Sequence, residues 1–154
     1  MAHADVADML LGEGLARIAR EVDAGFDRLL AMPQDSRARL VEAMRYAAIG
    51  GGKRLRPLLL TATSDMYGVD RQSAVRAGLA VEAIHVYSLI HDDLPCMDDD
   101  ELRHGKPTVH RAFDEARGDT VGTRSGAGAL AGRVAMQRTL FAGGRSARTS
   151  HCYR

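Results

Sequence analysis

The sequence predicts an all-α protein that ends in a tail of different composition. Four segments between residues 6 and 91 carry apolar residues at intervals of three to five, the spacing of amphipathic helices. Glycine or proline separates these segments, and no stretch has a convincing strand pattern. With 154 residues, of which 45% are hydrophobic, the chain has the size and apolar content of one domain.

The first two predicted helices lie on either side of Pro33, which ends the first of them. Ser36 is expected to cap the second helix, and Gly50–Gly52 stop it. The apolar stripe of the first helix, within residues 6–32, consists of Met9, Leu10, Leu15, Ile18, Val22, Phe26, Leu29 and Leu30. Each helix is therefore expected to bury one face against a neighbour.

The third and fourth predicted helices span residues 56–67 and 72–91. Pro57 suits the first turn of the third helix, because an N–H at that position would have no partner within the helix. The second half of the fourth helix is apolar almost all round. We therefore expect a central helix that is buried on most sides.

The overall composition argues against several classes of function. The formal net charge is +1, which indicates neither a nucleic-acid partner nor an anionic membrane surface. Two cysteines, Cys96 and Cys152, cannot make a disulfide framework. The N-terminal residues lack a signal-peptide pattern, and no segment comes near the roughly 20 apolar residues of a membrane span. We therefore expect a soluble cytoplasmic protein.

The composition changes at residue 117. Residues 117–154 contain seven arginines and a single acid, Asp119, so this tail carries +6 and residues 1–116 carry −5. The tail also holds seven of the sixteen glycines and can hardly form a packed core. We interpret it as the product of a shifted reading frame in GC-rich coding sequence, or else as a disordered basic tail. A nucleic-acid-binding tail is disfavoured, because lysine is absent and aromatic residues are few.

Six carboxylates lie within ten residues, Asp92–Glu101, directly after the fourth predicted helix. Asp92 and Asp93 would stand at the C-terminal end of that helix, where the dipole disfavours negative charge, and crowded carboxylates disfavour one another's ionisation. A solvated acidic surface is the alternative, but a largely buried helix delivers its end into the body of the fold. A bound hard cation, Mg²⁺ or Mn²⁺, would relieve both costs.

Pro95 decides which of these carboxylates can share a cation. In an unbroken helix Asp92 and Asp98 would lie about 120° apart around the axis. The Pro95 ring would clash with the carbonyl of His91, so the helix must kink or loop, which lets Asp98 return beside Asp92. We therefore predict a magnesium site at Asp92 and Asp98, with the remaining positions left for water and a substrate phosphate.

Two basic clusters accompany the acidic run. Lys53, Arg54 and Arg56 lie on a glycine-flanked turn that leads into a helix, where backbone N–H groups favour an anion. Residues 103–106 form the second cluster, with Arg103, Lys106 and His104. A solvated loop is the alternative for the first cluster, because it lacks the full phosphate-loop signature. Together with the metal site, the clusters suggest two anionic substrate groups.

Two motifs in combination resemble the polyprenyl diphosphate synthase family, the all-helical short-chain prenyltransferases. They are GGKRLRP at residues 51–57 and LIHDDLPCMDDDELRHGKPTVH at residues 89–110. The resemblance covers roughly residues 40–116. It implies that residues 1–116 form the front half of the isoprenoid synthase helical bundle. The implied reaction condenses isopentenyl diphosphate with an allylic diphosphate, dimethylallyl or geranyl.

The resemblance also implies a role for each acidic residue and for Arg103. Asp92 and Asp98 would bind Mg²⁺ that bridges to the allylic diphosphate, with assistance from Asp93. Arg103 would contact the same diphosphate. Metal ions and cationic side chains would then stabilise the departing diphosphate and leave an allylic carbocation.

The diphosphate of isopentenyl diphosphate would lie on the other basic residues. The resemblance assigns it to Lys53, Arg56 and His85. His104 stands where the family normally has a second arginine contacting this diphosphate. A neutral imidazole is a weaker partner for an anion than a guanidinium, so the resemblance implies a weaker contact here.

Product length is expected to depend on Tyr87 and Ser88, which lie about one turn before Asp92. An aromatic residue there, together with the DDLPCMD form, resembles bacterial farnesyl (C15) diphosphate synthases. Smaller residues resemble geranylgeranyl (C20) diphosphate synthases. The alternative is that Tyr87 is an ordinary core residue.

The family's second Asp-rich motif has no counterpart in residues 117–154. We therefore expect this chain to be inactive alone, and a full-length member to be a homodimer. Two other classes of function remain open. One is a non-catalytic, diphosphate-binding or regulatory partner of a complete synthase, and the other is an unrelated Mg²⁺-dependent phosphate enzyme.

Overall fold

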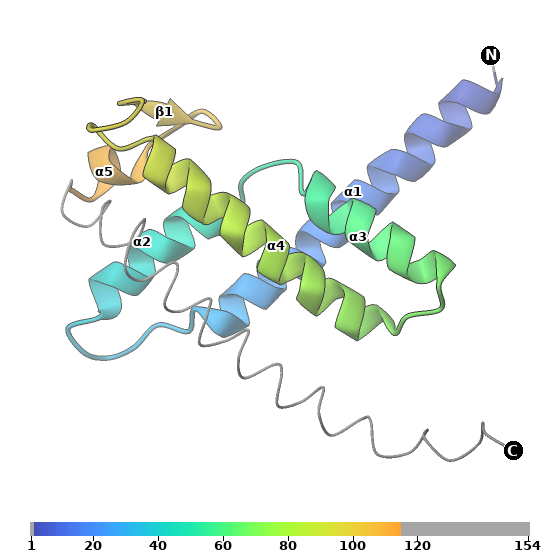
Figure 1. Ribbon diagram of the computed structural model, residues 1–154, viewed down its shortest axis with the longest axis horizontal. Coiled ribbons are helices and arrows are strands. Elements are labelled where there is room, and N and C mark those ends of the chain that lie inside the picture. Colours follow the sequence, from blue (N-terminus) through green and yellow to red (C-terminus); the bar gives the residue numbers. More distant parts are fainter. Residues whose placement is uncertain (1, 115–154) are drawn as a thin grey trace, which may run out of the picture.

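The computed structural model describes residues 2–114, and this part of the chain is almost entirely helical (Figure 1). The helices are α1 (Ala2–Leu29), α2 (Ala38–Ala48), α3 (Leu55–Met66), α4 (Arg71–Asp92) and α5 (Val109–Ala112), and one hairpin joins β1 (Leu102–Arg103) to β2 (Lys106–Pro107). The all-α prediction is confirmed. The predictions for residues 117–154 lie outside the described residues.

Helix α4 is the centre of the arrangement, as the sequence predicted. It packs against α1, α2 and α3, with α3 alongside it and α1 crossing it (Figure 1). Gly78 makes the approach of α3 possible, because a Cβ atom at this position would lie only 3.2 Å from Cβ of Pro57. Pro57 therefore begins a helix and also fits its ring against a neighbouring backbone.

Two clusters of buried apolar residues hold the helices together. The first joins α1 to α2 and α4 and consists of Ile18, Val22, Phe26, Ala48 and Leu79. The second lies where α2, α4 and α5 meet and consists of Ala43, Ile90 and Val109. The predicted stripe of α1 is buried at Ile18, Val22 and Phe26, whereas Met9 and Leu10 are more than half exposed because no described element covers that end of the helix.

The predicted cap of the second helix is wrong. Helix α2 begins at Ala38, two residues after Ser36, and its N-cap residue is Arg37, which makes no side-chain capping hydrogen bond. The backbone N–H of Arg37 donates instead to Oδ1 of Asp35, at 2.9 Å. The Asp35 carboxylate also accepts a hydrogen bond from the Arg37 side chain. Asp35 therefore takes the place that the sequence assigned to the hydroxyl of Ser36.

The hairpin was not predicted. Its strands are two residues long, with Leu102 paired to Pro107 and Arg103 to Lys106, too short to produce an alternating pattern. His104 and Gly105 form the turn with φ angles of 54° and 77°. Positive φ at both central residues is typical of the tight turns that connect such strands.

The prediction that α4 is buried on most sides is wrong for one face. Val81 and Ile84 are 39% and 54% exposed, and nothing within residues 2–114 covers them.

By length and average composition alone α4 could also cross a membrane, so the prediction that no segment comes near the length of a membrane span is wrong for this helix. A helix that packs in a protein core passes the same test, and the packing of α4 against three other helices accounts for its apolar composition.

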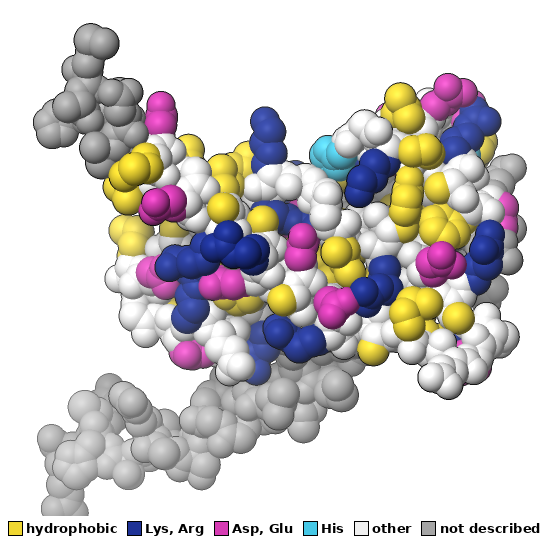
Figure 2. Space-filling model, turned by 180° about the vertical axis from the view of Figure 1, so that it is seen from behind, with side chains coloured by type: hydrophobic (Ala, Val, Ile, Leu, Met, Phe, Trp, Pro, Cys, Tyr) yellow, Lys and Arg dark blue, Asp and Glu magenta, His cyan; other side chains and the backbone are white. Residues whose placement is uncertain are grey.

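Charged side chains of both signs are mixed on the surface. On the face shown in Figure 2, Lys and Arg side chains alternate with Asp and Glu, and hydrophobic side chains lie scattered among them. This face of the described region therefore has no continuous basic stripe of the kind that follows a nucleic-acid backbone.

Candidate functional site

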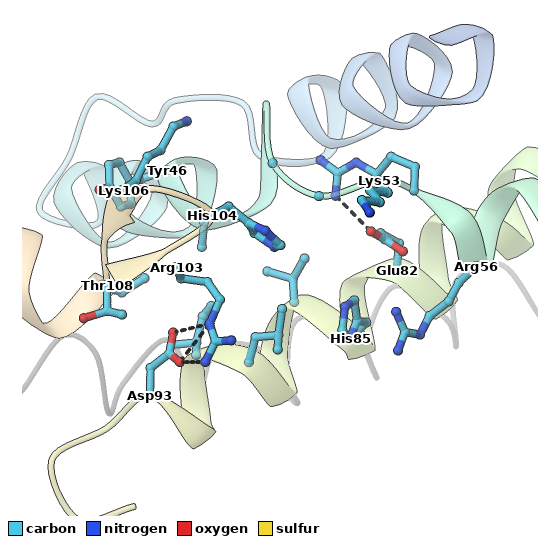
Figure 3. A pocket seen from close by; sticks show the side chains of 18 of the residues that line it. Tyr46, Lys53, Arg56, Glu82, His85, Asp93, Arg103, His104, Lys106 and Thr108 are labelled. Atoms are coloured by element: carbon cyan, nitrogen blue, oxygen red, sulfur yellow. Dashed lines mark hydrogen bonds and ion pairs between the residues drawn. The ribbon is translucent and has the colours of Figure 1, made fainter. Parts of the chain in front are cut away.

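A pocket of about 300 Å³ lies between the end of α2, the loop before α3, the second half of α4 and the hairpin. Seven basic residues contribute to its wall: Lys53, Arg54, Arg56, His85, Arg103, His104 and Lys106. Figure 3 shows Lys53, His85 and Arg56 near one end and Arg103 near the other, with His104 between them. The pocket therefore brings together all five residues predicted to bind substrate.

The loop before α3 has an unusual backbone. Gly50 and Gly52 have φ angles of 72° and 75°, a conformation that glycine adopts without strain. Arg54 also has a positive φ, 52°, which is uncommon for a residue with a side chain. Lys53 and Arg56 stand on either side of it, and their side chains are exposed towards solvent and the pocket.

His85 lies on α4 among other cationic groups. Burial lowers the pKa of its imidazole, and the charge of Arg56 lowers it further, while Glu82 acts in the opposite direction. Burial and the charge of Arg56 therefore favour the neutral imidazole. An anion bound beside His85 and Arg56 would reverse part of this effect, because it would favour the charged form.

Arg103 binds two acidic residues of the site. Its Nε donates to Oδ1 of Asp93 at 3.0 Å, its Nη2 contacts the same oxygen, and Nη2 also lies 2.7 Å from Oδ2 of Asp100. Asp93 is 4% exposed. These hydrogen bonds, above all those to Asp93, raise the pKa of Arg103, so its positive charge is secure.

Asp92 and Asp98 lie outside the wall of this pocket. Helix α4 ends at Asp92, the chain turns through residues 94–97, and the backbone N–H of Asp98 donates to the carbonyl of Asp92 at 2.9 Å. The prediction that Pro95 breaks the helix and returns Asp98 beside Asp92 is confirmed for the backbone. Asp92 is half-buried and Asp98 is exposed, so both carboxylates can reach a ligand from solvent.

The donor set at this turn fits a hard divalent cation. Carboxylate oxygens are the ligands that Mg²⁺ prefers. Within residues 2–114, however, three or more candidate ligands do not gather at one point. Asp92 and Asp98 would therefore supply only part of a coordination sphere, and water or substrate oxygens would have to complete it, as is usual for Mg²⁺.

Tyr87 and Ser88 also lie outside the pocket wall. The hydroxyl of Ser88 donates to the carbonyl of His85 at 2.9 Å, and the ring of the half-buried Tyr87 has its centroid 6.3 Å from that of His91. His85, Ser88 and Asp92 follow each other at intervals of three and four on one face of α4. The predicted chain-length region thus adjoins both the aspartates and His85.

Tyr46 and Glu82 are among the wall residues that the sequence reasoning missed. Tyr46 donates its hydroxyl to the carbonyl of Pro107 at 2.8 Å and so ties α2 to the hairpin. Glu82 is buried and binds Arg54, with Nη1 and Oε1 3.0 Å apart. An acid in the middle of an apolar helix was a signal for Glu82, because such a residue is seldom buried without a partner.

These features define an all-α bundle in which one pocket gathers cationic side chains beside an aspartate-rich turn. The polyprenyl synthetase family matches residues 37–125, more than half of the chain. The chain therefore belongs to this family, in agreement with the resemblance of its two motifs.

Individual relatives agree with this assignment. The farnesyl diphosphate synthase of Haemophilus influenzae is 53% identical over 100 residues, which cover 65% of this chain and 32% of that protein. The farnesyl diphosphate synthase of Bacillus subtilis is 57% identical over 77 residues, or 50% of this chain and 26% of the relative. The chain spans about a third or less of the length of these relatives.

Solved structures show the same fold. An FPP/GFPP synthase from Zymomonas mobilis is 49% identical and superposes with a TM-score of 0.76, covering 86% of this chain and 52% of that chain. A geranyltransferase from Legionella pneumophila is 35% identical with a TM-score of 0.72, covering 87% and 44%. The aligned part of this chain thus corresponds to about half of the length of these two proteins.

Proposed function

We propose that residues 1–116 form the N-terminal part of a prenyl diphosphate synthase that joins isopentenyl diphosphate to an allylic diphosphate, dimethylallyl or geranyl. The observation that carries the proposal is the convergence of Lys53, Arg56, His85 and Arg103 on one pocket beside the Asp92–Asp98 turn. Diphosphate groups are the ligands that such a cationic pocket favours. The family membership of the chain supports the same substrate class.

In this proposal each substrate has its own anion site. Lys53, Arg56 and His85 hold isopentenyl diphosphate, and His104, which lines the same pocket, assists them. Arg103, kept in place by Asp93, faces the diphosphate of the allylic substrate. Because both substrates are held at their charged ends, their hydrocarbon ends are oriented for reaction.

The reaction needs no nucleophile from the protein. The bond between C1 of the allylic substrate and its diphosphate oxygen breaks, and the diphosphate leaves with the electron pair. The double bond of isopentenyl diphosphate supplies electrons to the resulting cation, and loss of a proton restores a double bond in the longer product. When bound at Asp92 and Asp98, Mg²⁺ would neutralise charge on the leaving diphosphate. The charge of Arg103 acts in the same direction.

Farnesyl diphosphate is the proposed product. In this proposal the Tyr87 ring limits the length of the growing chain, and two of the relatives named above are farnesyl diphosphate synthases, which supports the C15 product. Geranylgeranyl diphosphate is the second candidate. A geranylgeranyl pyrophosphate synthase of Arabidopsis thaliana, number 12, is 57% identical over 83 residues, so overall similarity does not separate the two products.

We further propose that the 154-residue polypeptide expressed alone binds diphosphate without turning it over. Residues 117–154 contain a single acid, so they offer no second group of carboxylates for the opposite side of the site. We propose that this segment is not part of the synthase domain, and that a full-length synthase with these residues acts as a homodimer. Product formation from labelled isopentenyl diphosphate by the purified polypeptide would contradict the first of these statements.

The central test is calorimetric titration of the 154-residue chain with inorganic pyrophosphate, with and without Mg²⁺. We expect Mg²⁺ to strengthen the binding of pyrophosphate. Asp92→Asn and Asp98→Asn should each reduce the affinity measured with Mg²⁺ by about tenfold or more. Asp99→Asn is the matched control, since Asp99 lies in the same acidic run and asparagine tolerates its φ angle of 51°. The metal site would be refuted if Mg²⁺ did not change the affinity for pyrophosphate, or if Asp99→Asn lost as much affinity as the other two variants.

A further inference from the structure

Arg54 differs from the other basic residues of the glycine-rich loop because its side chain points into the protein. It is 3% exposed, whereas Lys53 and Arg56 are exposed. Its guanidinium binds three acceptors: Oε1 of Glu82 at 3.0 Å, Oδ1 of Asp23 at 2.8 Å and the carbonyl of Ala48 at 2.6 Å. These contacts attach the loop to α4, α1 and the end of α2 at once.

The net charge of this cluster excludes a direct role in attracting an anion. Arg54 contributes one positive charge, and Glu82 and Asp23 contribute two negative charges, so the cluster as a whole does not attract an anion. Glu82 even stands in the wall of the pocket beside the cationic side chains (Figure 3). If Arg54 and Glu82 affect diphosphate binding favourably, they must do so through the position of other groups.

These other groups belong to the glycine-rich loop, whose backbone has several positive φ angles. Arg54 has a φ angle of 52°, and two of the four residues before it also have positive φ. A residue with a side chain keeps such a conformation only where its surroundings hold it. The second oxygen of Glu82, Oε2, is buried and has no hydrogen-bond partner within the described region, which is a further cost of this arrangement.

We propose that the buried Arg54–Glu82 ion pair is a positioning device that holds the glycine-rich loop so that Lys53 and Arg56 face the pocket. Because the side chains of Lys53 and Arg56 are exposed, the direction in which they point depends on the backbone on either side of Arg54. Glu82 also lies three residues before His85 on α4, so one carboxylate links the loop to the helix that carries the third predicted ligand. The inference rests on the proposed function, because it assigns a role in binding diphosphate.

Titration of the 154-residue chain with inorganic pyrophosphate tests this role. Simple Coulomb attraction predicts that Glu82→Gln tightens binding, because the variant removes a negative charge from the pocket wall. The positioning role predicts the opposite sign, a loss of about tenfold, comparable to one charge-assisted hydrogen bond. Arg54→Lys, which keeps the charge but cannot reach all three acceptors, should also weaken binding about tenfold.

Glu21→Gln is the matched control. Glu21 binds Arg71 at 2.7 Å and so also links α1 to α4 through an ion pair, but neither residue lines the pocket. This variant should leave pyrophosphate affinity unchanged. Calorimetry reports the dissociation constant of the folded fraction separately from the number of sites, so partial unfolding of a variant lowers the second value and not the first.

The outcomes are distinct. If Glu82→Gln and Arg54→Lys bind pyrophosphate as well as or better than the unaltered chain, the ion pair does not position the loop and the inference is wrong, while the proposed function stands. If the unaltered chain itself takes up no pyrophosphate, the proposed function fails and this inference fails with it.

Discussion

Arg103 lies directly against Asp93, with its Nε 3.0 Å from Oδ1 of the buried carboxylate. Both residues belong to the predicted site, yet in this structure they bind each other. Asp93 ends up beside the last residue of α4, and Arg103 belongs to the first strand of the hairpin, so the pair fixes the hairpin to the helix end. Asp93 therefore fixes the position of Arg103.

Removal of the negative charge of Asp93 should reduce the stability of the chain. We expect Asp93→Asn to lower the free energy of unfolding by about 1–2 kcal/mol, less than for a fully buried pair because Arg103 is half-exposed and also bound to Asp100. Urea denaturation measures the change. Asp35→Asn is the control, because its pair with Arg37 is on the surface, and it should lower the free energy of unfolding by much less. Equal losses in the two variants would contradict the account.

His85 predicts a pH dependence with a definite sign. Burial and the charge of Arg56 hold the pKa of the folded imidazole below its ordinary value of about 6.5, so the folded chain binds this proton less well than the unfolded chain. The contribution of neutral His85 to stability is thus present above pH 6.5 and is lost as the pH falls from 6.5 through the lower, folded pKa. His85→Gln should reduce this loss in urea denaturation measured at several pH values.

Pyrophosphate should shift the same titration in the opposite direction. A bound anion beside His85 favours the imidazolium, so the pKa of His85 should rise when pyrophosphate is added. Proton NMR of the histidine ring measures both states, and His85→Gln identifies the signal. A pKa at or above the ordinary value in the free chain, or one that pyrophosphate leaves unchanged, would contradict the position assigned to His85.

The sequence predicted the elements that have strong local signals. The apolar spacing of Ile18, Val22 and Phe26 predicted the buried face of α1, and Pro95 predicted the turn that returns the chain to Asp92. The partners of Arg54 could not be predicted, because its three acceptors lie on three other segments that meet only in the folded chain. The hairpin was missed for a different reason, since two-residue strands leave no periodic signal.

Two glycines within helices should respond to alanine in opposite ways. A Cβ atom at Gly78 would lie 3.2–3.3 Å from Cβ and Cα of Pro57, and the backbone of α3 cannot easily move away. We expect Gly78→Ala to destabilise the chain by about 1–3 kcal/mol. At Gly12, on the exposed part of α1, a Cβ atom would meet nothing within 4 Å, so Gly12→Ala should stabilise by up to about 1 kcal/mol. Thermal denaturation that shows the same sign for both would refute the close packing of α3 on α4.

The last prediction concerns Tyr87 and the length of the product. If the ring limits the growing chain, Tyr87→Ala in a full-length farnesyl diphosphate synthase that carries this α4 segment should shift the main product from C15 towards C20. The half-buried ring packs near His91, one turn further along α4, so its loss would open space beside the row of Ser88 and Asp92.

Product analysis by chromatography after dephosphorylation measures this shift. Val81→Ala is the control, because Val81 is an exposed apolar residue of the same helix that lies further from the aspartates, and it should leave the product at C15. If Tyr87→Ala lowers only the stability of the enzyme and the product stays C15, then Tyr87 is an ordinary packing residue. The limit on chain length must in that case come from another side chain, such as Ser88 or a residue outside α4.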